Sequence, residues 1–237
     1  MAKILIVPDV HGRTFWHKAE ELIDEVDQVV FLGDYLDPYP HEGISFDEAL
    51  NEFTSILLFK EKYPDKVVLL LGNHDMHYMV KEFMDCSRLN RSRRSELYEL
   101  YNEYFDDFNL VHFIEDKYVF SHAGLYEAWM NKYNLSIDEL KDYKTFLKER
   151  WYTLEDCNWR RGGYDRAGSC VWADIRDSLS KDALIPNVIQ IVGHTQLDKV
   201  PYITDNIACL DVRSCFILDT ETYEINKVTE GIVKEVK

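Results

Sequence analysis

The sequence predicts an α/β fold whose first strands are parallel, because strand-like and helix-like segments alternate along its first third. Seven short runs of apolar and β-branched residues have the length of buried strands: 4–7, 29–32, 67–71, 118–121, 188–192, 207–211 and 215–218. Between the first three runs, residues 15–26 and 46–62 carry apolar side chains at the spacing of one buried helix face. The last runs are separated by short polar turns and are predicted to pair antiparallel.

The length and composition fit a globular chain. The 237 residues are enough for a sizeable core, and 46% hydrophobic with 30% charged residues argues against a disordered or membrane-spanning chain. We expect a single domain over 1–237, with helical caps or insertions around 76–110 and 125–168. In the segment 46–62, the residues Phe46, Leu50, Phe53, Leu57 and Leu58 are expected to share the buried face.

The charge and the cysteines narrow the class of protein. A formal net charge of -16 repels nucleic-acid backbones, so we expect no broad DNA or RNA binding and at most a local basic pocket. The five cysteines are odd in number and have no C-x-x-C spacing, which favours reduced thiols in the core of a cytoplasmic protein. The first apolar run is too short for a signal segment or a membrane span, so no membrane association is expected.

Polar side chains follow five of the predicted strands at the points where the strands end. The sequences there are P-D-V-H-G, G-D-Y-L-D, G-N-H-D, S-H-A-G and G-H-T; they contribute Asp9, His11, Asp34, Asp37, Asn73, His74, His122 and His194. Ligand sites of open α/β sheets lie beyond the carboxyl ends of the strands, so these side chains are expected to converge. A plain turn after 67–71 would need Gly72 and accept Asn73, but it would have no need of His74.

These side chains together favour a pair of divalent metals. Imidazole and carboxylate ligands suit Mn, Fe and Zn, and no cysteine is placed to join them. Asp34 is central in the order of the motifs and is the expected bridging carboxylate. Two metals about 3.5–4 Å apart can hold a bridging hydroxide and clamp a phosphoryl group for in-line attack.

Taken alone, each of these residues has a structural alternative. Asp9 or Asp34 could cap a helix, His122 could be a hydrogen-bonded core histidine, and Asp37 could be a turn residue. The ordered set of five motifs favours the ligand interpretation. His77 is expected on the surface rather than in the site.

The motifs D-x-H-G, G-D-x-x-D, G-N-H-D, H-A-G-L and G-H-T, in this order from Asp9 to Thr195, resemble the calcineurin-like metallophosphoesterase superfamily. Three details are similar to its phosphoprotein-phosphatase branch, which includes serine/threonine phosphatases and diadenosine tetraphosphatases. They are H-A-G-L, a G-H-T without a second histidine, and the tryptophan-containing segment 168–174. The resemblance implies a four-layer αββα sandwich, in which two mixed β-sheets are flanked by helices.

The resemblance also implies a role for each motif residue. Six residues would bind the two metals: Asp9 and His11 the first, Asp34 both as the bridge, and Asn73, His122 and His194 the second. His74 would protonate the leaving oxygen or hold the phosphate, and Asp37 would orient it. Because a carboxylate partner raises the basicity of an imidazole, the imidazolium form of His74 is expected near neutral pH. Mn is the favoured metal, and Fe or Zn are alternatives.

One motif departs from the branch. Its G-D-x-x-D is usually followed by R-G, and that arginine grips the phosphate, whereas Asp37 is followed here by Pro38 and Tyr39. Arg13 and Arg161 are the candidate substrate-binding replacements, because a guanidinium suits phosphate oxygens. The arginines between positions 88 and 94 are expected on a solvated helix face or cap, with a phosphate contact as the alternative.

The expected function is hydrolysis of a phosphomonoester, carried by a phosphoprotein, a nucleotide or a small molecule, through attack of a metal-bridging hydroxide. A dinucleoside polyphosphate hydrolase and a phosphodiesterase or nuclease are the enzymatic alternatives. The acidic surface and the absence of G-H-x-H argue against a nuclease. A metal-free scaffold of the same fold is the non-enzymatic alternative, and the complete ligand set argues against it.

Overall fold

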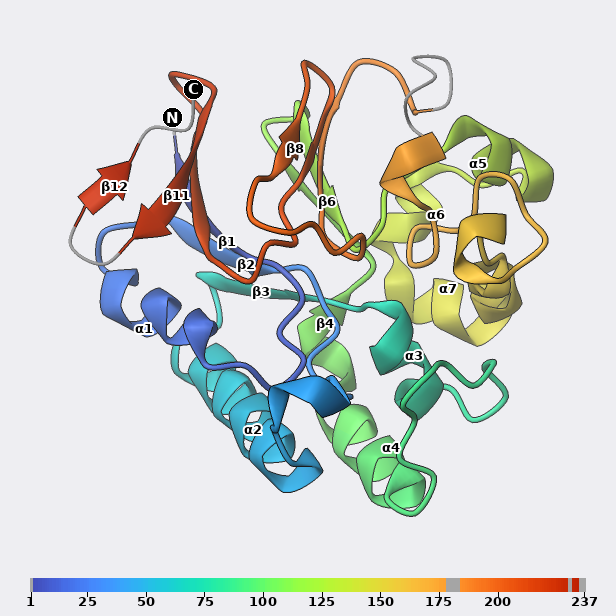
Figure 1. Ribbon diagram of the computed structural model, residues 1–237. Helices are drawn as coiled ribbons and strands as arrows, with labels where there is room; N and C mark the ends of the chain where they lie inside the picture. The colour runs from blue at the N-terminus through green and yellow to red at the C-terminus, as the bar shows by residue number, and fades with distance from the viewer. Residues whose placement is uncertain (1, 178–183, 230–231, 235–237) are drawn as a thin grey trace.

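Two β-sheets form the centre of the molecule (Figure 1), whose computed structural model describes residues 2–177, 184–229 and 232–234. Within these residues, one sheet has seven strands in the order β12-β11-β10-β1-β2-β3-β4. They are β1 (Lys3–Val7), β2 (Gln28–Phe31), β3 (Val67–Leu70), β4 (Phe108–Asn109), β10 (Phe216–Asp219), β11 (Glu224–Thr229) and β12 (Ile232–Lys234). The other described sheet has the order β5-β6-β7-β9-β8. Its strands are β5 (Val111–Ile114), β6 (Tyr118–Ser121), β7 (Ile189–Val192), β8 (Tyr202–Ile203) and β9 (Ile207–Cys209).

The strand pairing confirms the predicted parallel first half. Strands β1 to β4 run parallel, and β10, β11 and β12 extend the same sheet antiparallel. In the second sheet β6, β7 and β9 are parallel, whereas β5 and β8 pair antiparallel at the edges. The prediction of antiparallel pairing is therefore wrong for β7 and β9, and also for β9 and β10, which lie in different sheets. The segment 193–206 between β7 and β9 is long enough for β9 to return in the same direction as β7.

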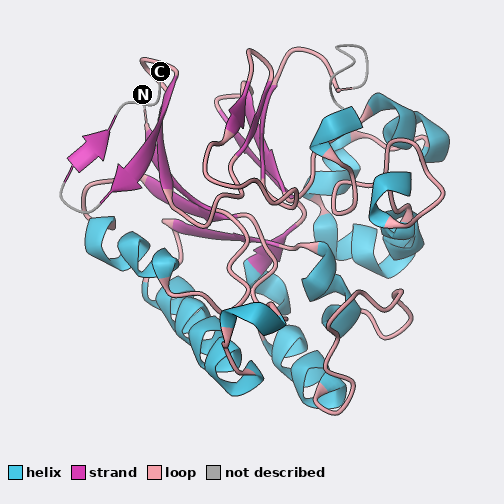
Figure 2. Cartoon of the chain, in the orientation of Figure 1, coloured by secondary structure: helices cyan, strands magenta, loops and turns pink. Residues whose placement is uncertain are grey.

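Helices flank the two sheets (Figure 2). The α-helices are α1 (Lys18–Leu22), α2 (Phe46–Lys62), α3 (Asn73–Met79), α4 (Arg94–Glu103), α5 (Glu127–Tyr133), α6 (Ile137–Lys141) and α7 (Tyr143–Arg150). Short 3-10 helices are η1 (Phe15–His17), η2 (Pro40–Glu42), η3 (Phe105–Asp107), η4 (Trp151–Glu155), η5 (Trp159–Arg161) and η6 (Ile175–Asp177). Figure 1 shows α1, α2 and α4 on one side of the seven-stranded sheet and α5 to α7 grouped together at one end of the molecule.

The helical predictions hold best where capping and periodicity agree. Helix α2 has the predicted bounds 46–62, and a capping box between Ser45 and Glu48 satisfies its first turn. Its buried face is shifted from the predicted one, because Leu58 is 55% exposed whereas Ile56 and Phe59 are buried. The predicted helix 15–26 is shorter and consists of η1 and α1, and the helical segment predicted from 76 onward is interrupted by a loop over 80–93.

The central strands β1 and β2 of the seven-stranded sheet are buried on both faces. One apolar cluster includes side chains of both sheets: Ile4, Ile6, Val30, Leu32, Leu70, Phe120, Ile191 and Phe216. On the opposite face, Leu5, Val29 and Phe31 belong to the cluster that contains Phe53 of α2. Burial on both faces explains why β1 is a continuous apolar run rather than an alternating one. The fold is thus the four-layer αββα sandwich of two mixed sheets that the resemblance implies.

The five cysteines are all buried and none forms a disulfide, which confirms their prediction as free thiols in the core. Within the described residues, no helix has the length and apolar character that a bilayer span requires. The loops that follow β1, β2 and β3 lie close to those that follow β6 and β7, and this meeting point of the two sheets contains the site described next.

Candidate metal centre

The six predicted metal ligands come together in the folded chain. Asp9 and His11 follow β1, Asp34 follows β2, Asn73 begins α3, His122 follows β6 and His194 follows β7. All six side chains are buried. Two overlapping groups of possible ligand atoms result, one of Asp9, His11 and Asp34 and one of Asp34, His122 and His194.

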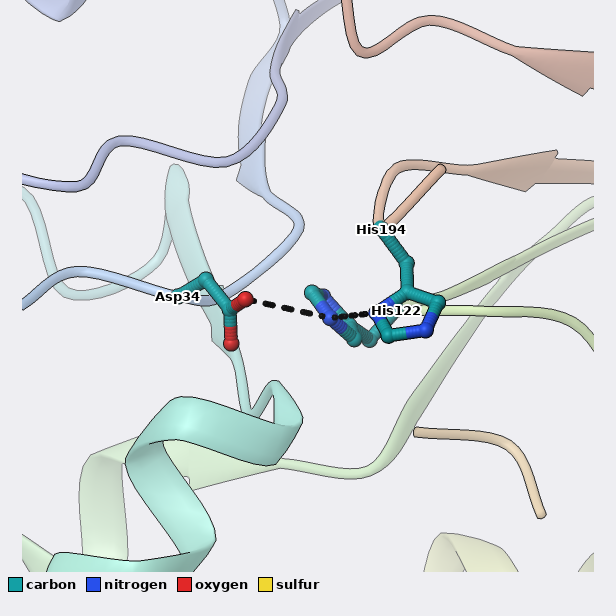
Figure 3. Close-up of side chains that lie close together, drawn as sticks. All are labelled: Asp34, His122 and His194. Atoms are coloured by element: carbon teal, nitrogen blue, oxygen red, sulfur yellow. Dashed lines mark hydrogen bonds and ion pairs between the residues drawn. The ribbon is translucent and has the colours of Figure 1, made fainter. Parts of the chain in front are cut away.

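The second group is built around His122 (Figure 3). Its Nε2 lies 3.1 Å from Asn73 Oδ1, 3.0 Å from His194 Nδ1 and 3.5 Å from Asp34 Oδ2. Four side chains from four separate segments therefore direct nitrogen or oxygen atoms toward one point. Such a set of N and O ligands suits a divalent cation.

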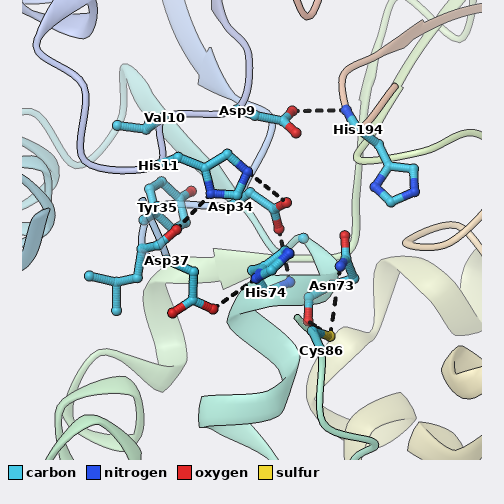
Figure 4. Close-up of polar contacts among 12 residues, drawn as sticks. Asp9, Val10, His11, Asp34, Tyr35, Asp37, Asn73, His74, Cys86 and His194 are labelled. Atoms are coloured by element: carbon cyan, nitrogen blue, oxygen red, sulfur yellow. Dashed lines mark hydrogen bonds and ion pairs between the residues drawn. The ribbon is translucent and has the colours of Figure 1, made fainter. Parts of the chain in front are cut away.

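Asp34 is shared between the two groups, with His11 beside it in Figure 4 and His122 beside it in Figure 3. Its Oδ2 lies 3.5 Å from His11 Nε2 and also 3.5 Å from His122 Nε2. Its Oδ1 accepts a hydrogen bond of 2.9 Å from the backbone N–H of His74, which fixes the carboxylate plane. The central position predicted for Asp34 from the order of the motifs is thus its position in space.

Hydrogen bonds to backbone carbonyls set the tautomers of two of the histidines. His11 Nδ1 lies 2.7 Å from the carbonyl oxygen of Leu36, and His122 Nδ1 lies 2.7 Å from that of Leu32. A carbonyl oxygen only accepts hydrogen bonds, so each Nδ1 carries the proton and each Nε2 turns a lone pair toward the site. This is the arrangement that metal-binding histidines adopt.

The electrostatics of the site also fit bound cations. Burial, together with the neighbouring carboxylates of Asp9 and Asp75, raises the pKa of Asp34 well above its ordinary value. Burial lowers the pKa of His11 and of His194 well below the usual value for an imidazole. A divalent cation would favour both the ionised carboxylates and the neutral imidazoles. The residues present therefore fit a pair of divalent metals.

Two glycines allow the strand ends to approach these carboxylates. A Cβ atom on Gly72 would lie 2.2 Å from Asp34 Oδ1 and 2.7 Å from His122 Cε1. A Cβ atom on Gly193 would lie 2.2 Å from Asp9 Oδ1. Any larger residue at either position would have to displace a candidate ligand, which explains why glycine precedes Asn73 and His194.

Asp37 accepts contacts from three side chains. His74 Nδ1 lies 2.8 Å and His77 Nε2 2.9 Å from Asp37 Oδ2, and the Tyr78 hydroxyl donates to Oδ1 at 2.6 Å. Although burial raises the pKa of Asp37, the hydrogen bonds from the two histidines outweigh it and hold the pKa below its ordinary value. The expectation that His77 lies on the surface is wrong, because it is fully buried against this carboxylate.

The protonation predicted for His74 is also corrected. Burial lowers its pKa to about 4 and outweighs the opposing effect of Asp37. With Nδ1–H donated to Asp37, the ring of His74 is neutral near pH 7 and its Nε2 carries a lone pair. The carboxylate partner therefore orients the ring without making the imidazolium form available in the free site.

Asp75 stabilises the backbone around the site. Its Oδ2 accepts hydrogen bonds of 2.7 Å from the backbone N–H groups of both Asp34 and Gly72. Its Oδ1 accepts a bond of 2.7 Å from the hydroxyl of Tyr101. A single buried carboxylate thus ties the end of β2 to the end of β3.

The two arginines predicted to bind substrate lie in different places. Arg161 lines the same cavity of about 310 Å³ as Asp9, His11, Asp34, Asn73 and His194. There it donates to Thr195 Oγ1 at 2.7 Å and pairs with Asp174. Arg13 pairs with Glu42 through contacts of 2.9 and 3.2 Å and lines a separate hollow. The position of Arg13 therefore does not support the predicted substrate contact.

The lining of this cavity includes Tyr39 and Trp172, two aromatic residues that the sequence offers as candidates for the pocket. Cys86 and Arg88 also line it. The replacement of R-G by Pro38-Tyr39 signals that a guanidinium has to come from elsewhere, but nothing in the spacing identifies which arginine supplies it. For Arg88 the expectation of a solvated helix face or cap is wrong, because Arg88 precedes α4 and reaches this cavity. The alternative expectation, a phosphate contact, stays open.

The comparisons with known proteins agree with this geometry. Residues 2–195 match the sequence model of the calcineurin-like phosphoesterases, and the chain belongs to this family. It is 29% identical over 128 residues to the serine/threonine-protein phosphatase 4 catalytic subunit of Candida glabrata, and 28% identical over 128 residues to human serine/threonine-protein phosphatase 5. Each match covers 52% of this chain but only 38% and 24% of the respective relative, so the chain spans well under half of their length.

Solved structures with low sequence identity share the fold. A cold-active protein-tyrosine phosphatase of a psychrophilic Shewanella species gives a TM-score of 0.67 at 16% identity, with 100% of this chain and 81% of that chain covered. A protein serine/threonine phosphatase from Saccharomyces cerevisiae gives a TM-score of 0.56 at 14% identity, with 91% and 72% covered. At these identities the likeness extends to the fold alone.

Proposed function

We propose that the protein is a phosphomonoesterase that uses two divalent cations sharing Asp34. The observation that carries the proposal is the position of Asp34 Oδ2, at 3.5 Å from both His11 Nε2 and His122 Nε2. The first cation would be held by Asp9 and His11, and the second by Asn73, His122 and His194. Mn is the favoured metal. Fe and Zn are alternatives, because nitrogen and oxygen ligands suit all three metals.

Bound cations of this kind supply Lewis acidity and an activated water at neutral pH. The protein's own contribution is orientation and charge. Asp37 holds the His74 ring through Nδ1, so that Nε2 points into the cavity where an ester oxygen would lie. A bound phosphate dianion beside Nε2 would favour the imidazolium form, and His74 could then hold the phosphate or protonate the leaving oxygen.

Arg161 is the proposed phosphate contact on the side of the second cation. Its bonds to Thr195 and Asp174 hold the guanidinium near His194 without removing it from the cavity. The similarity to serine/threonine phosphatases supports a monoester substrate, and a phosphoprotein or a small phosphorylated molecule is proposed.

The choice between monoester and diester is tested with Mn-loaded protein and two chromogenic substrates. We expect p-nitrophenyl phosphate to be hydrolysed faster than bis-p-nitrophenyl phosphate, and we expect chelation of the metal to abolish the activity. A faster diester reaction would contradict the proposal in favour of a phosphodiesterase. If the metal-loaded protein hydrolyses neither substrate, the proposal of a general phosphoesterase is contradicted. If the protein binds no metal, only the alternative of a non-catalytic scaffold with the same fold remains.

A further inference from the structure

The guanidinium of Arg88 lies between two imidazoles of the site. Its Nη2 is 3.3 Å from His74 Nε2 and 3.5 Å from His11 Nε2, and its Nε donates to the carbonyl oxygen of Asp37 at 2.9 Å. The two contacted nitrogens are the atoms that the proposed function directs toward the substrate and the first cation. Arg88 thus reaches the reacting region from the loop between α3 and α4, outside the motifs that form the metal site.

Tyr39 supports this position of the side chain. The Arg88 Cζ atom lies 3.9 Å from the centre of the Tyr39 ring, a distance at which a cation is attracted to an aromatic face. Tyr39 also packs edge to face with the His11 ring, and the two ring centres are 5.1 Å apart. In the sequence, Tyr39 and Pro38 occupy the place of the missing R-G after Asp37. The segment that lacks the arginine of the motif therefore provides the aromatic ring against which Arg88 packs.

The loop that carries Arg88 is bonded to the same groups that orient His74. The backbone N–H of Cys86 donates to His77 Nδ1 at 3.2 Å, and the backbone N–H of Asn90 donates to the Tyr78 hydroxyl at 2.9 Å. His77 and Tyr78 are in turn two of the side chains that contact Asp37. Hydrogen bonds on both sides of Arg88 therefore fix its backbone relative to the Asp37–His74 pair.

Within the described part of the chain, the positive charge of Arg88 has no carboxylate partner and is available to an anionic ligand. Among the described residues, no carboxylate forms an ion pair with Arg88, whereas Arg13 pairs with Glu42 and Arg161 with Asp174. Contacts of 3.3 and 3.5 Å to imidazole nitrogens are long for hydrogen bonds. Phosphate oxygens would be better acceptors, because charge-assisted bonds to a guanidinium are shorter and stronger.

We propose that Arg88 binds the phosphoryl oxygens of the substrate and that Tyr39 positions its guanidinium. This proposal rests on the proposed phosphoesterase function and specifies how its site recognises the phosphate. Arg88 replaces the arginine absent after Asp37 and binds from the side of the first cation, opposite Arg161. Its contacts with His74 Nε2 and His11 Nε2 would both give way to contacts with phosphate oxygens, because the proposed function assigns His11 Nε2 to the first cation.

The test compares four variants of Mn-loaded protein with the wild type. Arg88→Ala removes the guanidinium, Arg88→Lys keeps a charge without the planar fork, and Tyr39→Leu removes the aromatic support. Arg91→Ala is the matched control, because Arg91 lies in the same loop, is 74% exposed and pairs with Asp85. For each variant, the inhibition constant of inorganic phosphate, its affinity by calorimetry and the bound metal are measured alongside hydrolysis of p-nitrophenyl phosphate.

We expect Arg88→Ala to weaken phosphate binding and kcat/KM by about 10- to 100-fold, with two metals still bound. Arg88→Lys should fall between the wild type and Arg88→Ala, and Tyr39→Leu should lose about 2- to 10-fold. Arg91→Ala should leave both quantities unchanged.

The outcomes separate this proposal from the function on which it rests. If the wild type hydrolyses the ester and Arg88→Ala binds phosphate as tightly as the wild type, the proposed role of Arg88 is overturned. The proposed phosphoesterase function would still stand. A second outcome is a wild type that binds phosphate but hydrolyses no ester, together with a loss of phosphate affinity in Arg88→Ala. This outcome would support the role of Arg88 in phosphate binding and contradict the proposed phosphoesterase activity. A wild type that neither binds phosphate nor hydrolyses esters would overturn both.

Discussion

Replacing Asp34 by Asn should abolish the response of the protein to divalent metal and lower its hydrolytic rate by more than about 100-fold. Partners that only orient a metal ligand already cost about 10- to 100-fold when they are mutated, and a ligand shared by two cations should cost more. The amide oxygen of the introduced asparagine would still accept the bond from the backbone N–H of His74. Asp34→Asn should therefore preserve the local fold while removing the bridging charge.

The metal-free stability of this variant gives a second readout. Burial and the charges of Asp9 and Asp75 disfavour the ionised form of Asp34, so Asp34→Asn should leave the apo protein at least as stable as the wild type. Metal at 100 times its dissociation constant should stabilise the wild type by about 2.7 kcal/mol and stabilise the variant much less. Asp47→Asn, 80% exposed on α2, is the control. An equal metal-induced shift of Tm in Asp34→Asn would contradict the bridging role.

Replacing His74 by Asn should lower kcat by about 100- to 10,000-fold, the range typical of a positioned acid–base group, while the metals remain bound. His74 contacts Asp37 through Nδ1 and points Nε2 into the cavity, so its loss leaves the six metal ligands in place. The measurement is steady-state kinetics on metal-loaded protein. His41→Asn is the matched control, because His41 is 67% exposed and outside the cavity, and its kcat should not change.

The leaving group distinguishes the two roles proposed for His74. Protonation of the leaving oxygen matters most for a poor leaving group, so a general acid predicts a larger loss with an alkyl phosphate than with p-nitrophenyl phosphate. A role in holding the phosphate predicts equal losses with both substrates. Unchanged kinetics in His74→Asn with either substrate would exclude His74 from the reaction.

The sequence predicts the centre of this site well, because the relevant residues follow strands. Each predicted ligand lies within a few residues of the end of an apolar run, and the carboxyl ends of neighbouring strands meet in one region. The central position of Asp34 follows from the same logic, since its carboxylate lies beside both His11 and His122. Its role as a bridge between two cations stays a prediction. Local order along the chain thus carries most of the information about the metal ligands.

The surroundings of the site depend on tertiary contacts that no local pattern encodes. His77 lies one helical turn beyond Asn73 and is buried against Asp37, which comes from another strand end. Arg88 reaches the cavity through an irregular loop, whose backbone is fixed by bonds to His77 and Tyr78. Arg13 directly follows the D-x-H-G motif in the sequence, yet its guanidinium forms an ion pair with Glu42. Sequence proximity therefore favours Arg13, whereas the folded chain places Arg88 rather than Arg13 on the lining of the cavity.

In the fold, too, features set within one segment are predictable from the sequence, whereas features set by distant contacts are not. Helix α2 is predicted to the residue because its periodicity and its capping box lie within the segment. The direction of β9 relative to β7 depends on how residues 193–206 cross the sheet, and a strand pattern contains no direction.

The central claim is that two cations share Asp34, and anomalous diffraction from crystals grown with Mn tests it most directly. The account predicts two anomalous peaks about 3.5–4 Å apart on either side of Asp34. One peak should lie beside Asp9 and His11, and the other beside Asn73, His122 and His194. Peaks absent from this cavity, or a single peak that Asp34 does not contact, would contradict the dinuclear site and the mechanism built on it.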